Sequence, residues 1–149
     1  CTGAIGAGRP RGSLALTHLV DTSVLTRLNQ PAVRTAVEHL ADSGRLGRAG
    51  ISDLEIGYAV RNAREWDSLQ EALASLELVE TTAAHVQRAR QVQRQLAASS
   101  QLGRKIPNLL VAAAEAVDLI VLHYDADFDR IAGVTGQKCS WAVPAGSVD

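Results

Sequence analysis

Short apolar segments that end at acidic residues recur along the chain, and they constrain the fold more than any other feature. The segment 17–20 is followed by Asp21, and the segment 119–122 is soon followed by Asp125 and Asp127. Helix-like stretches separate such segments, and strands that alternate with helices are typical of an α/β fold. In an open sheet of this kind, ligands bind in the crevice at the carboxyl ends of the strands. The sequence therefore predicts that distant acids gather at one edge of one sheet.

The spacing of apolar residues predicts the individual elements. Strands are expected at 17–20, 48–51, 76–80, 119–122 and 139–143. Helices are expected at 22–28, 31–40, 52–62, 66–76, 82–99, 107–116 and, after a loop, within 125–132. The segment 119–122 is the clearest strand, because it is apolar at every position, as in strands that are buried on both faces. We therefore expect a parallel sheet with helices on both sides.

One domain is expected, at residues 17–149. The chain has 149 residues, and 46% of them are hydrophobic, which is enough for an aliphatic core. Residues 1–16 are set apart, because the stretch 1–12 is rich in glycine and lacks periodicity, and because the chain contains no Met. We interpret residues 1–16 as a vector-derived or disordered leader.

Apolar runs and cysteines bear on the cellular compartment. No apolar run approaches the ~20 residues that span a bilayer. Of the two cysteines, Cys1 lies in the leader, so a disulfide with Cys139 is not expected. A reducing cytosol fits this cysteine usage. We expect a cytoplasmic protein with no membrane partner.

The charge balance does not by itself identify a partner. The formal net charge is −1, so bulk electrostatics do not predict a polyanionic partner, although a bound cation or a local Arg patch can reverse the sign of one cleft. Arg outnumbers Lys, which reflects either genome base composition or phosphate recognition by guanidinium groups. Arg104 and Lys105 lie on an expected loop. They are either simply solvated or hold a phosphate beside the acidic crevice.

The acids after the first and fourth predicted strands each allow two interpretations. Asp21 is either a helix N-cap, where Asp is favoured, or a metal ligand or nucleophile at the end of a strand. Asp125 and Asp127 are either solvated loop residues or part of a site. Like charges packed so closely are unfavourable without a cation. A hard divalent ion such as Mg²⁺ would resolve this repulsion.

Two further positions are ambiguous when they are considered alone. The segment 52–55, Ser-Asp-Leu-Glu, matches a capping box, in which Ser52 and Glu55 would satisfy each other's backbone N–H groups. Glu55 cannot both cap its own helix and serve a metal at the sheet edge. Asn108 follows Pro107 in the first turn of an apolar helix, where either an amide or an acid is acceptable.

Four motifs taken together resemble PIN-domain ribonucleases, in particular the VapC-type toxins. They are LVDTSVL at 19–25, ISDLEI at 51–56, KIPNLLVAAA at 105–114 and LHYDADFDRIA at 122–132. The resemblance covers residues 18–143, and the motifs occur in the family's order. It implies a three-layer α/β/α PIN-like domain with a central parallel sheet.

The same resemblance implies an activity and a set of site residues. It implies an endoribonuclease that depends on Mg²⁺, or on Mn²⁺ as a substitute, and that cleaves RNA such as tRNA or rRNA. The acidic quartet falls on Asp21, Glu55, Asn108 and either Asp125 or Asp127, and all of these except Glu55 are candidate metal ligands. Thr22 or Ser23 supplies a supporting hydroxyl, and Arg104 and Lys105 are candidate RNA-binding residues. The implied partners are a VapB-type antitoxin and a second copy of the toxin.

Asn108 departs from the family pattern, which has Asp at this place. An amide removes one negative charge and offers one good metal-binding oxygen, so weaker metal binding and a lower rate are expected. Asn108 is either a deliberate Asp→Asn change in a toxic nuclease or the mark of a naturally weakened member. The alternative function is a catalytically inactive PIN-like module that binds an antitoxin or RNA.

Overall fold

A computed structural model shows a five-stranded sheet in the order β3-β2-β1-β4-β5, and every neighbouring pair of strands is parallel. The structure describes residues 16–101, 103 and 118–149. The expected leader up to residue 15 and the expected helix at 107–116 lie outside these residues. Within them, no helix combines the length and the apolar character that a membrane crossing requires.

The elements follow the predicted alternation of strands and helices. The strands are β1 (His18–Val20), β2 (Leu46–Ala49), β3 (Glu77–Val79), β4 (Ile120–His123) and β5 (Cys139–Trp141). The described helices are α3 (Thr22–Leu25), α4 (Pro31–Ala41), α5 (Gly50–Gly57), α6 (Ala63–Leu73), α7 (Ala83–Ala98) and α9 (Asp127–Thr135). All five predicted strands are confirmed. The second strand spans residues 46–49 and not 48–51, and α5 starts directly after it at Gly50.

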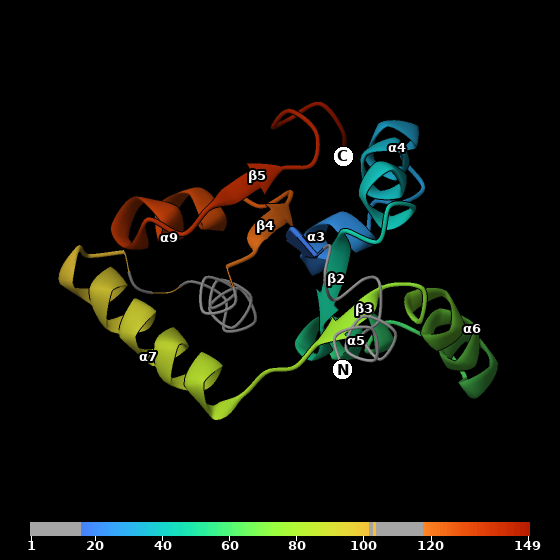
Figure 1. Cartoon of the computed structure of the whole chain (residues 1–149), viewed down its shortest axis with the longest axis horizontal. Helices are drawn as coiled ribbons and strands as arrows, with labels where there is room; N and C mark the ends of the chain where they lie inside the picture. Colours follow the sequence, from blue (N-terminus) through green and yellow to red (C-terminus); the bar gives the residue numbers. More distant parts are fainter. Residues whose placement is uncertain (1–15, 102, 104–117) are drawn as a thin grey trace, which may run out of the picture.

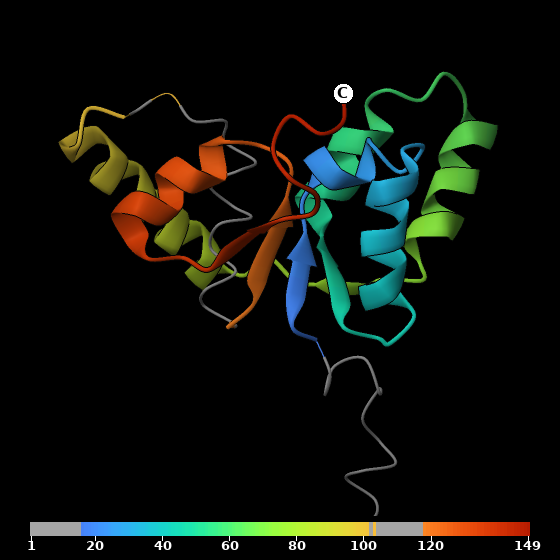
Figure 2. The same cartoon turned by 90° about the horizontal axis from the view of Figure 1, so that it is seen from above.

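The sheet separates two apolar cores, so the domain has three layers. Successive residues of a strand point to opposite faces: Leu19 packs with α7 and α9 on one face, whereas Val20 packs with α3 and α4 on the other. In β4, Val121 lies in the same core as Leu19, and Leu122 lies in the same core as Val20. Figures 1 and 2 show α7 and α9 on one side of the sheet and α4 and α6 on the other. The expected α/β/α architecture with a central parallel sheet is confirmed.

The register of the central strands brings distant residues together at the carboxyl edge. Val20 of β1 is paired with Leu122 of β4, and the Asp21 N–H donates to the Leu122 carbonyl oxygen at 2.9 Å. The residues that follow β1 and β4 therefore begin side by side. On the other flank of β1, β2 runs directly into α5, which carries Glu55.

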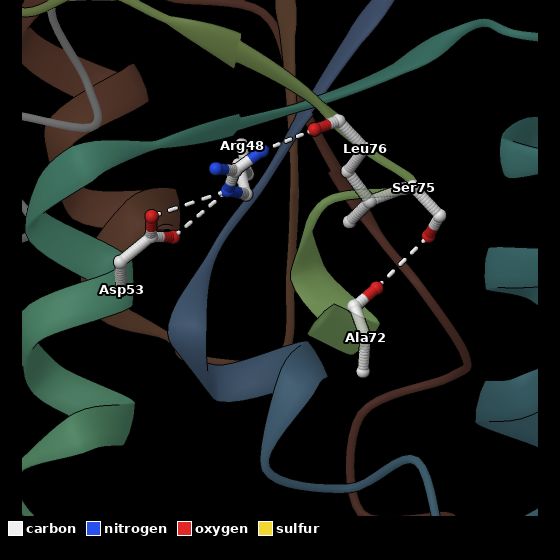
Figure 3. Close-up of polar contacts among 5 residues, drawn as sticks. All are labelled: Arg48, Asp53, Ala72, Ser75 and Leu76. Carbon is white, nitrogen blue, oxygen red and sulfur yellow. Dashed lines mark hydrogen bonds and ion pairs between the residues drawn. The ribbon is translucent and has the colours of Figure 1, made fainter. Parts of the chain in front are cut away.

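A half-buried ion pair anchors α5 to the sheet (Figure 3). Arg48 of β2 donates from Nε to both carboxylate oxygens of Asp53, at 3.0 and 3.2 Å, and from Nη1 to the main-chain oxygen of Leu76. The Arg48 and Asp53 side chains are 13% and 17% exposed. Asp53 lies in the first turn of α5, where a negative charge interacts favourably with the helix dipole. The pair thus joins β2, α5 and the start of β3.

Candidate active site

A pocket of about 460 Å³ opens at the carboxyl edge of the sheet, where β1 and β4 end. Its walls come from three places, namely α3 with the residues just before and after it, Glu55 of α5, and the loop between β4 and α9. The lining residues are Asp21, Thr22, Ser23, Thr26, Arg27, Glu55, Tyr124, Asp125 and Ala126. The structure therefore brings together predicted site residues from three of the four motifs. Asn108, Arg104 and Lys105 lie outside the described residues.

Asp21 is the most buried carboxylate of the pocket, with 2% of its surface exposed. It is the N-cap of α3, and its Oδ2 accepts from the Ser23 N–H at 2.9 Å and from the Ser23 hydroxyl at 2.6 Å. Its other oxygen, Oδ1, is buried and has no hydrogen-bond partner among the described residues. The two interpretations of Asp21 are thus compatible, because one oxygen caps the helix and the other remains for a ligand.

The environment of Asp21 favours its neutral form. Burial raises the pKa of the Asp21 carboxyl, and the nearby Asp125 charge raises it further, although the Ser23 hydrogen bonds oppose both effects. A buried, unpaired carboxylate oxygen that lies near a second acid is unfavourable unless a cation or a proton is present. This electrostatic conflict is the one that the sequence predicts.

Two adjacent hydroxyl groups hold the acids of the pocket. The Ser23 hydroxyl donates to Asp21 and accepts from the Tyr124 N–H at 2.9 Å, so it ties the end of β1 to the end of β4. The Thr22 hydroxyl donates to Glu55 Oε1 at 2.7 Å, across 33 positions of the sequence. In this structure, both candidate supporting hydroxyls therefore contact an acid of the pocket.

Glu55 does not take part in a capping box, so that interpretation was wrong. The N-cap of α5 is Ala49, which makes no side-chain capping bond, and Ser52 is already the third residue of the helix. The Ser52 hydroxyl is buried and has no hydrogen-bond partner within the described part of the chain. Because β2 leads into α5 without a loop, the helix starts earlier than the motif suggests. Glu55 instead turns toward Thr22 and the pocket.

The structure distinguishes Asp125 from Asp127. Asp125 lines the pocket, and its Oδ1 accepts from the Asp127 N–H at 2.9 Å. Asp127 is the first residue of α9 and is not among the residues that line the pocket. Its Oδ1 lies 3.8 Å from Arg130 Nη1, one turn along the helix. Of the two acids that the sequence left open, Asp125 is the one at the pocket.

Three residues of this region were not predicted as site residues. Arg27 and Tyr124 line the pocket. His123 is fully buried, its Nδ1 accepts from the Asp125 N–H at 3.2 Å, and burial lowers its pKa, which favours the neutral ring that this bond requires. The sequence held one usable signal, because Arg27 is four residues after Ser23 and so lies one helical turn from it.

The donor chemistry of the pocket fits a hard divalent cation. Mg²⁺ keeps several waters in proteins and is usually bound through one or two carboxylates. Asp21 and Asp125 are two such groups, and Asp21 Oδ1 is the buried atom without a partner among the described residues. Over residues 16–101, 103 and 118–149, however, no three His, Cys, Asp or Glu side chains form a group that could hold a metal ion. The described residues thus bring two carboxylates, those of Asp21 and Asp125, into the same pocket.

Sequence comparisons identify relatives that span most of the chain. Residues 18–134 match the family model of the PIN domain. The chain is 59% identical over 137 residues to "Ribonuclease VapC51" of Mycobacterium tuberculosis, an alignment that covers 91% of this chain and 100% of that protein. It is 38% identical over 133 residues to "Ribonuclease VapC21" of the same species, covering 87% of this chain and 96% of that protein.

Solved structures with the same fold come from toxin–antitoxin complexes. The DNA-bound VapBC of Salmonella typhimurium aligns with a TM-score of 0.72 at 16% identity, covering 86% of this chain and 99% of that chain. VapBC2 of Rickettsia felis, bound to a DNA fragment from its promoter, aligns with a TM-score of 0.70 at 16% identity, covering 84% and 98%. At such low identity these structures support the fold alone.

Proposed function

The chain belongs to the PIN domain family, and on that premise we propose that it is a VapC-type endoribonuclease, the toxin of a toxin–antitoxin pair. One observation carries the proposal: a buried Asp21 oxygen without a partner among the described residues lies in the same pocket as Asp125. The two relatives named above are themselves called ribonucleases, which supports the reaction class.

The proposed cofactor is Mg²⁺, with Mn²⁺ as an alternative ion. Asp21 and Asp125 would hold it, and Asn108 and Asp127 are the other predicted ligands. When bound there, such an ion would lower the pKa of a coordinated water toward neutral pH and would stabilise charge on the phosphoryl group. Ser23 keeps Asp21 in place by its hydroxyl.

Thr22 and Glu55 have a separate role in the proposed reaction. The Thr22 hydroxyl donates to Oε1 of Glu55 at 2.7 Å, and both residues line the pocket. A carboxylate held in this way can accept a hydrogen bond from the attacking water and so orient it. We assign Glu55 this orienting role and not that of a direct metal ligand.

The proposed partners follow from the complexes that share the fold. A VapB-type antitoxin is the proposed protein partner, and the VapBC assemblies of Salmonella typhimurium and Rickettsia felis support it. The proposed substrate is RNA, with tRNA and rRNA as the candidate classes, and the proposed oligomer is a homodimer. Size-exclusion chromatography with light scattering, on the chain alone and with a co-expressed antitoxin, tests the oligomer and the partner.

Asn108 decides how active this chain is expected to be. An amide in place of the third acid should weaken Mg²⁺ binding and slow cleavage, because it carries no charge. We expect Asn108→Asp to increase Mg²⁺-dependent cleavage of a mixed tRNA and rRNA substrate. No gain would favour the alternative of an inactive module that binds an antitoxin or RNA.

A matched set of variants tests the reaction itself. In the Asn108→Asp background, Asp21→Asn and Asp125→Asn should abolish cleavage, and EDTA should do the same. Asp42→Asn is the control, because Asp42 is exposed beyond the end of α4 and does not line the pocket. Full activity in the Asp21 variant would contradict the assignment of the site.

A further inference from the structure

Arg27 stands out in the pocket because of its charge. Among the described residues that line the pocket, it is the basic side chain, and it shares the pocket with three acids, Asp21, Glu55 and Asp125. Three carboxylates alone would repel an RNA phosphate. A basic side chain in the pocket offsets part of this repulsion whether or not a metal ion is bound, and Arg27 is placed to supply it.

The guanidinium of Arg27 is held in a fixed orientation. Its Nη1 donates to the Ser23 carbonyl oxygen at 2.7 Å, and its central carbon lies 4.8 Å from the centre of the Tyr124 ring. A cation over an aromatic face is stabilised by the ring's quadrupole. Arg27 is half-buried, so its planar group is positioned before any ligand arrives. Such a planar fork matches the geometry of a phosphate.

The segment Val148–Asp149 contacts this guanidinium at its Nε group. Arg27 Nε donates to the Asp149 main-chain oxygen at 2.7 Å. The Tyr124 hydroxyl holds the preceding residue, because it donates to the Val148 carbonyl oxygen at 2.7 Å and accepts from the Val148 N–H at 3.2 Å. Figure 2 shows the chain after β5 returning toward α3 at the carboxyl edge of the sheet.

A phosphate should compete well for the position of Asp149. Asp149 is exposed and contacts Arg27 through one main-chain oxygen, whereas a phosphodiester can offer two charged oxygens to the same fork. We propose that Arg27 is the phosphate-binding side chain of this pocket and that Val148–Asp149 occupies its site until RNA displaces the segment. This inference rests on the proposed RNA cleavage.

A purely structural role for Arg27 is the competing explanation. In that case Arg27 only anchors Val148–Asp149, and replacing Arg27 would change RNA binding only because the segment is released. The variant Tyr124→Phe separates the two roles, because it removes both hydrogen bonds to Val148 and keeps the ring under Arg27. Arg34→Ala is a matched control, since Arg34 Nε also donates to a main-chain oxygen, that of Leu28 at 3.0 Å, but lies outside the pocket.

The test measures RNA binding without cleavage. A fluorescein-labelled single-stranded oligoribonucleotide is titrated with the full chain in EDTA, and anisotropy is recorded at several salt concentrations. Arg27→Ala should weaken binding about tenfold and reduce the slope of log K against log salt by ~0.7, as expected for one phosphate contact. The RNA affinity of Arg27→Lys should lie between that of Arg27→Ala and that of the unmodified chain, because lysine keeps the positive charge but lacks the planar guanidinium. Tyr124→Phe should bind more tightly than the unmodified chain.

The outcomes separate this inference from the proposed function. The phosphate role is overturned if Arg27→Ala binds RNA as tightly as Arg34→Ala does, or if Arg27→Ala no longer weakens RNA binding in the Tyr124→Phe background. The proposed RNA cleavage can still stand in either case. If the unmodified chain neither binds nor cleaves RNA, the proposed function fails and this inference fails with it. Thermal melting of each variant, compared with Arg34→Ala, shows whether the change in affinity comes from a folded protein.

Discussion

Replacing Ser23 by Ala removes the hydroxyl that bridges the Asp21 carboxylate after β1 and the Tyr124 N–H after β4. The lost bond to Asp21, at 2.6 Å, is charge-assisted, and such bonds contribute about 1.5–3 kcal/mol. The Tyr124 N–H, which lies 2.9 Å from the same oxygen, is left without its acceptor, at a cost of about 1–3 kcal/mol. Asp21 keeps its bond to the Ser23 N–H. Because water can reach the open pocket, we expect Ser23→Ala to lower the free energy of unfolding by about 2–4 kcal/mol.

The loss should also depend on pH. The Ser23 hydroxyl lowers the pKa of Asp21 against the larger effect of burial, so its removal raises that pKa further above the ordinary value of 3.8. An acid whose folded-state pKa is raised destabilises the protein at high pH, where the buried group must be charged. The cost is relieved as the pH falls through the folded-state pKa and the folded protein takes up a proton. The loss in free energy of unfolding caused by Ser23→Ala should therefore become smaller as the pH is lowered.

Urea unfolding followed by circular dichroism, at pH 7 and at mildly acidic pH, measures both effects. Ser43→Ala is the matched control, because the Ser43 hydroxyl also donates to main-chain oxygens, those of His39 at 3.3 Å and Leu40 at 3.1 Å, but is exposed. It should change stability by less than about 0.5 kcal/mol. Equal losses in the two variants would refute the bridging role of Ser23. A large loss that does not vary with pH would refute the coupling to Asp21.

Three further predictions concern charged or titratable groups. Asp21→Asn should raise the midpoint of urea unfolding at pH 7, because it removes a buried charge. This gain should disappear as the pH falls toward 3.8, the ordinary pKa of the group. An unchanged midpoint at pH 7 would contradict the raised pKa of Asp21. Arg48→Met should lower the free energy of unfolding by about 2–3 kcal/mol, because it leaves Asp53 charged and largely buried. Arg61→Met is its control. Because the Arg61 side chain is 84% exposed, this change should alter the free energy of unfolding by less than about 1 kcal/mol. Burial raises the pKa of the Cys139 thiol to about 12, so Cys139 should react with iodoacetamide at pH 8 far more slowly in the folded chain than in urea, as peptide mass spectrometry can show.

The fold was predictable because the strands carry a strong pattern, and the main error has a local cause. The segment 119–122 is apolar on both faces and was located within one residue of β4. The strand β2 was placed two residues late because its sequence, Leu-Gly-Arg-Ala, contains Gly47, which is normally unfavourable in a strand. The structure explains the glycine, since a Cβ at Gly47 would lie 2.9 Å from Val79 Cγ2 on β3. A close approach between strands cannot be derived from the segment alone.

The site was only partly predictable, because tertiary contacts decide the role of each acid. The motif at 52–55 is a sound capping signal, but the partner that Glu55 takes is Thr22, which lies 33 positions earlier in the sequence. The sequence does not distinguish Asp125 from Asp127 as the acid of the pocket. The structure distinguishes them because α9 begins at Asp127. For Arg27, the four-residue spacing relates it to Ser23, but its contact with Tyr124 crosses from the turn after α3 to the loop after β4.

Asp21 shows why stability and the proposed activity oppose each other at this position. Its Oδ2 already provides what the fold needs, an N-cap for α3, and an amide oxygen could accept the same hydrogen bonds. The charge strengthens the bond from the Ser23 hydroxyl, but burial together with Asp125 makes the charged form unfavourable on balance, and Oδ1 has no hydrogen-bond partner among the described residues. A carboxylate that is costly to the fold yet buried beside a second acid is expected where a cation is bound. Mg²⁺ should therefore stabilise the unmodified chain against urea more than it stabilises Asp21→Asn, and equal stabilisation would mean that the acid has no role in metal binding.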